Sequence, residues 1–195
     1  MWKSTLKEYK IVLGSGSPRR QEFLSQLHLD FEVRTFPVEE VYPSDLKGHE
    51  IADYLAKLKA NALLPTLKDR EIIITSDTVV WHRNTALGKP KNTENAIAML
   101  KILSGDWHEV ITSVCFTTTK KQILVNETTK VKFKELSEEE ILFYCNLQPP
   151  LDKAGGYGIQ DWIGLIGIEK IEGSYSNVVG LPTHLVYKTL MRMVA

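Results

Sequence analysis

Apolar positions recur along this chain with two different spacings, which predicts a mixed α/β fold. Short apolar or alternating runs are typical of strands, and apolar positions three or four residues apart are typical of amphipathic helices. The predicted strands cover Tyr9–Leu13, Phe31–Val38, Glu71–Trp81, His108–Thr117, Ile123–Phe133 and Leu165–Ile171. The predicted helices cover Pro18–Leu27, Glu50–Leu64, Thr93–Leu103, Ser137–Tyr144 and Leu181–Met193, with Thr93 and Ser137 as N-caps. The central pair of long strands forms a hairpin, which departs from pure βαβ winding.

The composition narrows the class of protein. The chain has 195 residues, 43% of them hydrophobic and 25% charged, which predicts one globular domain over residues 1–195. Lysine plus arginine and aspartate plus glutamate both total 24, so the formal net charge is zero. A general nucleic-acid binder would need a basic surplus, and we therefore expect no nucleic-acid partner.

The expected location is the cytoplasm. Cys115 and Cys145 show neither a zinc spacing nor a Cys-x-x-Cys motif, and we interpret them as buried free thiols in a reducing compartment. No apolar stretch approaches the length of a membrane span. The first eight residues lack the apolar core of a signal peptide.

The first strand leads into a turn that suits a bound anion. Gly14-Ser15-Gly16 ends the apolar run, Ser17 is a candidate N-cap, and Pro18 takes the first helical position. Arg19 and Arg20 then lie in the first helical turn, where free backbone N–H groups already favour negative charge. A phosphate at this position explains the two guanidinium groups. The alternative is an ordinary strand–turn–helix with exposed arginines.

Several charged residues form a set suited to phosphate chemistry. Asp77 interrupts an apolar strand, and a buried carboxylate is costly unless it is paired, hydrogen-bonded or metal-bound. The alternative is a carboxylate satisfied by a lysine or by backbone N–H groups. Glu39 and Glu40 follow the second strand, Lys59 lies on a helix, and Lys89 lies in a Gly-Lys-Pro loop. Carboxylates with nearby cations predict a phosphate-ligand enzyme that uses Mg²⁺ or Mn²⁺.

A series of motifs in order along the chain resembles the Maf family. The motifs are Ser15-Gly16-Ser17-Pro18-Arg19-Arg20, Val38-Glu39-Glu40, Leu55-Ala56-Lys57-Leu58-Lys59-Ala60, Ser76-Asp77-Thr78-Val79-Val80, Gly88-Lys89-Pro90, Leu103-Ser104-Gly105, Asp152-Lys153-Ala154-Gly155-Gly156-Tyr157-Gly158-Ile159-Gln160 and Val179-Gly180-Leu181-Pro182. Each motif is weak alone, but their order and spacing match from Ile11 to Met193. The resemblance implies the fold shared with inosine triphosphate pyrophosphatases: a long, curved mixed sheet flanked by helices, two lobes with a central cleft, and often a homodimer.

The resemblance also implies an activity and its residues. Maf proteins cleave nucleoside triphosphates between the α and β phosphates, which gives a monophosphate and pyrophosphate. By position, Asp77 matches the catalytic acidic residue, as proton acceptor or metal ligand, and Glu39 matches a second acidic residue on the metal. The positions that match triphosphate-binding residues are Ser15, Arg20, Lys59 and Lys89. Alignment favours Glu39 over Glu40, although the residues themselves leave this choice open.

Three further positions indicate the base. Maf proteins that favour dTTP and UTP carry Arg, Thr and Gln where those that favour 7-methyl-GTP carry Trp, Gln and Glu. This chain has Arg19, Thr78 and Gln160, which predicts a dTTP/UTP enzyme. A rival interpretation within the same class is an enzyme whose natural substrates are modified pyrimidine nucleotides. It departs from the pattern at Gly14 and at Asp161-Trp162, where small residues are common after the glutamine. The alternative function is a nucleotide-binding regulator of cell division that no longer hydrolyses.

Overall fold

The computed structural model describes residues 6–194 and confirms the mixed α/β fold. Seven strands form one sheet in the order β2-β1-β3-β5-β6-β7, with β4 paired to β3. The strands are β1 (Lys10–Leu13), β2 (Phe31–Val33), β3 (Glu71–His82), β4 (Thr85–Leu87), β5 (Trp107–Thr117), β6 (Gln122–Phe133) and β7 (Ile168–Glu172). The sheet is mixed because β1 runs parallel to β2 and β3, whereas β4 and β7 run antiparallel to β3 and β6.

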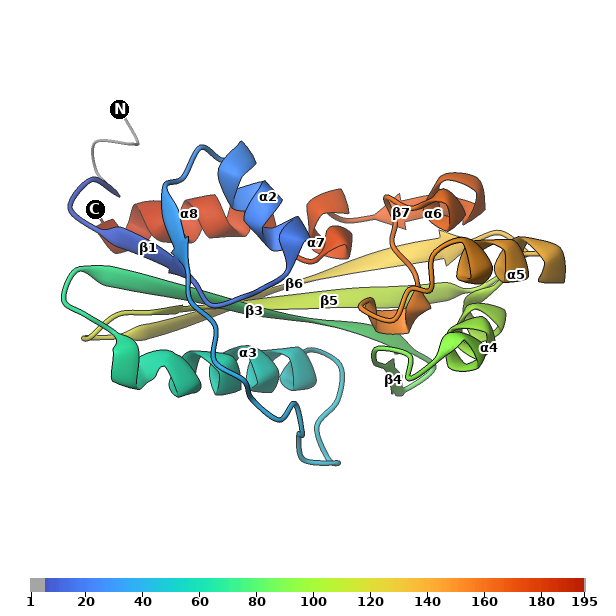
Figure 1. The fold of residues 1–195 in the computed structure, drawn as a ribbon, viewed down its shortest axis with the longest axis horizontal. Coiled ribbons are helices and arrows are strands. Elements are labelled where there is room, and N and C mark those ends of the chain that lie inside the picture. Colours follow the sequence, from blue (N-terminus) through green and yellow to red (C-terminus); the bar gives the residue numbers. More distant parts are fainter. Residues whose placement is uncertain (1–5, 195) are drawn as a thin grey trace. The chain divides into compact units, whose positions relative to one another are not determined.

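The helices alternate with the strands in the first half of the chain and cluster towards its end (Figure 1). They are α2 (Pro18–Gln26), α3 (His49–Leu63), α4 (Thr93–Leu103), α5 (Glu138–Leu147), α6 (Trp162–Gly167), α7 (Tyr175–Val179) and α8 (Thr183–Val194), with 3-10 turns η1 (Leu64–Thr66) and η2 (Ala154–Gly156). None of these helices within residues 6–194 has the length and apolar character needed to cross a bilayer. The first five residues of the segment considered for a signal peptide lie outside the described residues.

The described residues group into two compact units, each made of several chain segments. The first unit holds the described residues up to Asp77, then Thr112–Glu127 and the residues from Gly180 onward. The second unit holds Thr78–Ile111 and Thr128–Val179. The sequence offers no linker at these boundaries, since each boundary at Asp77, Ile111 and Glu127 falls inside a strand.

The strand periodicity of two builds the first unit as a layered structure. Ile11 and Leu13 of β1 pack with Leu24 of α2 and with α8 on one face. Val12, between them, points to the other face and packs with Leu63 of α3. In Figure 1, α3 accordingly lies on one side of these strands, and α2 and α8 lie on the other.

The second unit has its own apolar core. The core contains sheet residues packed against helix residues. The sheet contributes Val80, Val110 and Phe133. The helical contributors include Leu100 of α4 and Tyr144 of α5. The glycine-rich stretch is anchored in this core by two of its residues, buried Tyr157 and Ile159.

The sequence prediction was wrong at several element boundaries. The second strand ends at Val33, not Val38, because its partner β1 ends at Leu13, which pairs with Val33 and accepts the last hydrogen bond from Arg34 N. The predicted strand Leu165–Ile171 begins only at Ile168, since its first residues close helix α6. Strand β4 and helix α7 were not predicted, and Asn92 caps α4 in place of Thr93.

Candidate functional site

The turn between β1 and α2 holds the guanidinium group of Arg20 against three oxygen acceptors. Arg20 Nη1 donates to Ser76 O at 2.8 Å and to Ser15 Oγ at 3.2 Å, and Arg20 Nε donates to Gly180 O at 3.0 Å. Gly180 has a φ of 124°, a conformation that favours glycine, so the backbone presents its carbonyl in a geometry few other residues adopt. Arg20 is therefore fixed in position before any ligand binds.

The start of α2 keeps the features expected of an anion site. Ser17 is the N-cap, but its side chain makes no capping hydrogen bond, and its backbone N–H donates to Ser15 Oγ at 3.3 Å. Pro18 stands at the first helical position, and the first turn contains no acidic residue. The positive end of the helix dipole is thus not offset by a carboxylate of the helix itself. Arg19, next in the chain, is partly buried.

Two carboxylates meet on the ammonium group of Lys59. Asp77 is only 7% exposed in β3, and its Oδ1 accepts a hydrogen bond from Lys59 Nζ. Glu40 Oε1 lies 2.9 Å from the same nitrogen. Burial lowers the pKa of Arg20, and the negative charges of Asp77 and Glu40 act in the opposite direction, which places this guanidinium within their field. Four charged groups from four separate segments therefore converge in the first unit.

The structure discriminates between the two neighbouring glutamates. Both side chains are exposed, and Glu40 Oε1 pairs with Lys59 Nζ at 2.9 Å. Glu40 is therefore the glutamate that joins the Lys59–Asp77 ion pair, and the choice of Glu39 from alignment stays a prediction. The irregular segment after β2 turns the two side chains differently, and periodicity has no rule for such a segment.

The donor set fits a divalent cation only if the substrate supplies part of the coordination. No group of three or more His, Cys, Asp or Glu residues that could hold a metal ion occurs among residues 6–194. Mg²⁺ commonly binds through one or two carboxylates together with substrate phosphates, and it keeps several waters. Asp77 and Glu40, which converge on one cationic group, are the two carboxylates that would supply such a pair of oxygen ligands.

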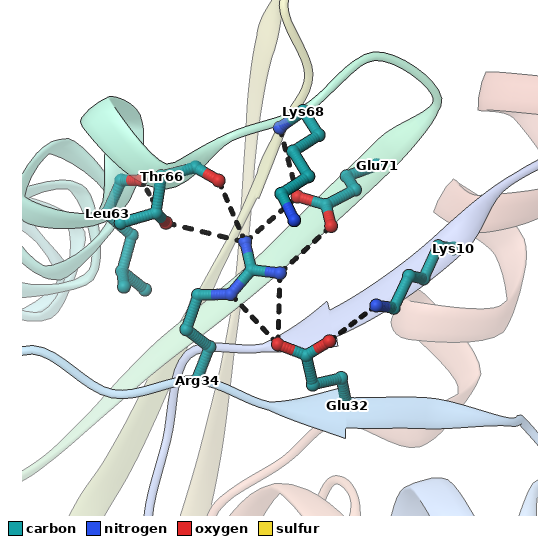
Figure 2. A network of polar contacts seen from close by, with 7 residues as sticks. All are labelled: Lys10, Glu32, Arg34, Leu63, Thr66, Lys68 and Glu71. Carbon is teal, nitrogen blue, oxygen red and sulfur yellow. Dashed lines mark hydrogen bonds and ion pairs between the residues drawn. The ribbon is translucent and has the colours of Figure 1, made fainter.

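A second polar network anchors the segment that carries Glu40. Figure 2 shows the Arg34 side chain bonded to Glu71, with both Nη–Oε distances at 2.9 Å. Arg34 also donates to Glu32 Oε1 at 3.0 Å and to Thr66 O at 3.0 Å, just beyond α3. Its backbone N–H donates to Leu13 O at 3.0 Å, at the end of β1. One residue thus ties together the start of β3, the end of α3 and the strand end before Ser15.

The remaining predicted site residues lie in the second unit. Thr78 is partly buried and follows Asp77 directly in β3. Lys89 is exposed, and the carbonyl of the preceding Gly88 accepts a hydrogen bond from Gly155 N at 3.0 Å. The Gly-Lys-Pro loop and the glycine-rich stretch are therefore held together within this unit. Gln160 is also exposed, at the end of that stretch.

Sequence reasoning missed the backbone acceptors of this site. The carbonyls of Ser76 and Gly180 fix Arg20, yet carbonyls carry no residue-type signal. The motif Val179-Gly180-Leu181-Pro182 indicates no role by residue type, and its glycine is the one signal of an unusual backbone conformation there. The buried hydroxyl of Ser76 has no hydrogen-bond partner among residues 6–194, and it lies beside the catalytic candidate Asp77 in the chain.

Comparisons with known proteins agree with the family resemblance that the sequence motifs indicate. The family described as Maf-like protein matches residues 10–193. A dTTP/UTP pyrophosphatase of Flavobacterium johnsoniae is 57% identical over 194 residues, which is 100% of either chain. Its counterpart in Flavobacterium psychrophilum is 56% identical and covers 98% of either chain. The solved Staphylococcus aureus Ham1 protein has a TM-score of 0.53 at 16% identity, covering 94% of this chain and 99% of that one, and this likeness concerns the fold alone.

Proposed function

The chain belongs to the Maf family, and from this premise we propose that it is a nucleoside triphosphate pyrophosphatase that hydrolyses dTTP and UTP. Three relatives that carry this name are 54–57% identical over nearly their whole length. The reaction releases pyrophosphate and leaves the nucleoside monophosphate. Modified pyrimidine triphosphates with the same base edge belong to the same substrate class.

The observation that carries this proposal is the convergence of Lys59, Asp77, Glu40 and Arg20. Two cations suit the non-bridging oxygens of a triphosphate, and two carboxylates suit a cation or a proton. A purely structural ion pair would not need a second carboxylate and a prepositioned guanidinium beside it. Asp77 in the interior of β3 is the costliest of these groups to bury, which supports a role in the reaction.

Each residue of the site has its own role in the proposed reaction. Arg20 and Lys59 bind phosphate oxygens and stabilise the charge that develops on the leaving pyrophosphate, with Ser15 Oγ and Lys89 as further donors. Asp77 accepts the proton of the attacking water. The oxygen of that water forms a bond to the α phosphorus, the bond from the α phosphorus to the bridging oxygen breaks, and the electron pair leaves with pyrophosphate.

Asp77 and Glu40 are the residues that would hold Mg²⁺ or Mn²⁺, with Glu39 as the alternative from alignment. Such an ion offsets phosphate charge and lowers the pKa of bound water.

We propose that Arg19, Thr78 and Gln160 select the base. The amide of glutamine presents one acceptor and one donor, which matches the alternating acceptor and donor edge of uracil or thymine. A glutamate at the same place would suit the adjacent N–H donors of a guanine instead. Gln160 is exposed and available for such a contact.

The remaining features concern location and assembly. Both cysteines are buried free thiols, which suits a reducing compartment, and we propose the cytoplasm. Exposed apolar side chains on α5 and α6 support a homodimer, and they are Leu142, Phe143, Leu147 and Leu165. The near-neutral charge supports the absence of a nucleic-acid partner. A regulator without hydrolysis is the weaker alternative, since the acidic and basic set is intact.

The test replaces Asp77 by asparagine. We expect Asp77→Asn to retain the fold and to lose pyrophosphate release from dTTP by at least about a hundredfold, as for loss of a general base. The matched control is Asp53→Asn in the same unit, where the carboxylate accepts hydrogen bonds from Ser113 Oγ at 2.6 Å and Asn126 Nδ2 at 3.0 Å. The control should remain active. Equal activity of wild type and Asp77→Asn would overturn the assignment of Asp77.

A further inference from the structure

Gln160 lies on a tight turn whose two ends are joined by hydrogen bonds. Asp161 N donates to Gly158 O at 3.0 Å, which makes Ile159 and Gln160 the two central residues of a β-turn. Ile159 is buried in the core of the second unit, and Gln160 is exposed. The turn therefore presents the glutamine side chain outward from an anchored base.

The hydroxyl of Tyr144 bridges both ends of this turn. It donates to Asp161 Oδ2 at 2.8 Å and accepts a hydrogen bond from Gly158 N at 3.3 Å. Tyr144 is only 2% exposed and lies on α5, in the core of the unit. Burial and the neighbouring Asp161 raise the pKa of this phenol, so it remains a neutral donor. A single buried group thus fixes the residues before and after the Ile159–Gln160 pair.

Asp161 Oδ2 is also held from a second side. Lys153 Nζ lies 3.6 Å from this oxygen and 2.8 Å from Asp152 Oδ1. The Lys153 side chain is only 9% exposed, so its charge is partly removed from solvent. The carboxylate of Asp161 is consequently restrained by a phenol and an ammonium group at once.

Two glycines allow the turn to be this compact. A Cβ on Gly158 would lie 2.6 Å from Asp161 Oδ2, and a Cβ on Gly164 would lie 2.1 Å from Ile159 O. A Cβ at position 158 would displace the Asp161 carboxylate, and a Cβ at position 164 would require the backbone at Ile159 to move. Asp161 O further accepts hydrogen bonds from Gly164 N at 2.9 Å and Leu165 N at 3.1 Å, at the start of α6. The turn is therefore clamped between its tyrosine and helix α6.

We propose that Tyr144 and Asp161 are positioning residues for Gln160, and that this buried tether sets the selectivity for a thymine or uracil base over cytosine. The inference rests on the proposed function, because it assigns Gln160 to the base. A side chain that reads a base by one amide must be held within a fraction of an ångström and a few tens of degrees to discriminate. A rigid turn supplies this accuracy without an entropic cost on binding.

The test is a double-mutant cycle that combines Tyr144→Phe with Gln160→Ala. The readout is the ratio of kcat/KM for dTTP to kcat/KM for CTP, which a general loss of stability would not change. We expect Tyr144→Phe to lower this ratio by about tenfold, the effect of roughly one hydrogen bond. In the Gln160→Ala background the same substitution should have no further effect, because its influence passes through Gln160. An equal loss in both backgrounds, or an unchanged ratio, would overturn the proposal.

A matched control exists in the same stretch. Tyr157 is also buried, and its hydroxyl lies 2.6 Å from His108 Nε2, away from the turn. Tyr157→Phe therefore makes the same chemical change at a comparable cost in stability, and we expect it to leave the dTTP/CTP ratio as in wild type. If Tyr144→Phe does not fold, Asp161→Ala replaces it. We expect Asp161→Ala to lower the ratio by the same factor and to have no further effect in the Gln160→Ala background.

The outcome can be separated from failure of the proposed function. Wild-type protein that releases no pyrophosphate from any nucleotide would overturn the function. The positioning is then measured by hydrogen exchange of the Asp161 backbone N–H. Tyr144→Phe should accelerate this exchange by about tenfold and Tyr157→Phe should not. Equal exchange rates in the two variants would refute the tether.

Discussion

Replacing Glu71 by glutamine should destabilise the first unit more than any surface substitution of the same kind. Glu71 is only 3% exposed, and the Arg34 side chain is 17% exposed. Both Glu71 oxygens accept hydrogen bonds from Arg34, and Oε2 also accepts one from Lys68 N at 3.0 Å. Glutamine keeps the shape of this side chain, but it removes the charge and turns one acceptor into a donor that faces the guanidinium.

The structure gives the size of the effect. The hydrogen bonds from Arg34 lower the pKa of Glu71 from 4.5 to about 2. This difference corresponds to about 3 kcal/mol of stability at neutral pH. Removal of one partner from a buried pair typically costs about 3–5 kcal/mol, because the other charge remains buried. We therefore expect Glu71→Gln to lose about 3 kcal/mol of unfolding free energy at pH 7.

The pH dependence follows from the direction of the shift. Because the folded-state pKa is lower than the unfolded one, the stabilisation is fully present above about pH 4.5 and is lost as the pH falls towards 2. At pH 3 only about 1 kcal/mol of it remains by the same linkage. The difference between wild type and Glu71→Gln should therefore shrink by roughly two thirds between pH 7 and pH 3.

Urea unfolding followed by far-ultraviolet circular dichroism at these two pH values measures both quantities. The matched control is Glu172→Gln, whose carboxylate pairs with Lys170 at 2.7 Å on the surface. This pair is about half exposed, so the unfolding free energy of Glu172→Gln should be indistinguishable from that of wild type. A loss of under about 1 kcal/mol for Glu71→Gln, or a loss that does not depend on pH, would refute the reasoning.

Two further predictions concern the site and the turn. Arg20→Lys keeps the positive charge but cannot reach Ser76 O and Gly180 O together, so the KM for dTTP should rise by at least about tenfold; steady-state kinetics measures this, and an unchanged KM would contradict the fixed position of Arg20. Gly164→Ala places a Cβ 2.1 Å from Ile159 O, so the protein should lose about 1–3 kcal/mol. Thermal unfolding measures this loss against Gly88→Ala, where nothing lies within 4 Å of the added Cβ. Equal melting temperatures of the two variants would contradict the prediction, because the turn would then accommodate the added Cβ.

Periodicity predicted the elements whose burial is repetitive. Strands β1, β3, β5 and β6 carry long apolar or alternating runs, and the structure places them near their predicted bounds. The pattern predicts strand from Leu165 onward because Leu165, Ile166 and Ile168 are apolar and partly β-branched, but residues 165–167 close helix α6. Its helical state depends on Asp161 O and on the close approach of Gly164 to Ile159 O. Contacts of this kind exist only after folding, so local preference could not reveal them.

The candidate site could likewise be predicted only in part from the sequence. The sequence singled out Asp77 because a carboxylate inside an apolar strand is costly, and the structure confirms that it is buried. Lys59 could not be separated from Lys57 by helix position, since only the folded chain shows which ammonium reaches Asp77. The choice between Glu39 and Glu40 depended on an irregular segment. Tyr144 gave no signal, because a buried aromatic residue on a helix is ordinarily part of the core.

The most direct test of the central claim is pyrophosphate release from a panel of dTTP, UTP, CTP, GTP and 7-methyl-GTP, with Mg²⁺, with Mn²⁺ and with chelator. The account predicts metal-dependent release from dTTP and UTP and little release from the guanine nucleotides. Release mainly from 7-methyl-GTP would contradict the roles of Arg19, Thr78 and Gln160. An absence of release from every nucleotide would contradict the hydrolytic function itself.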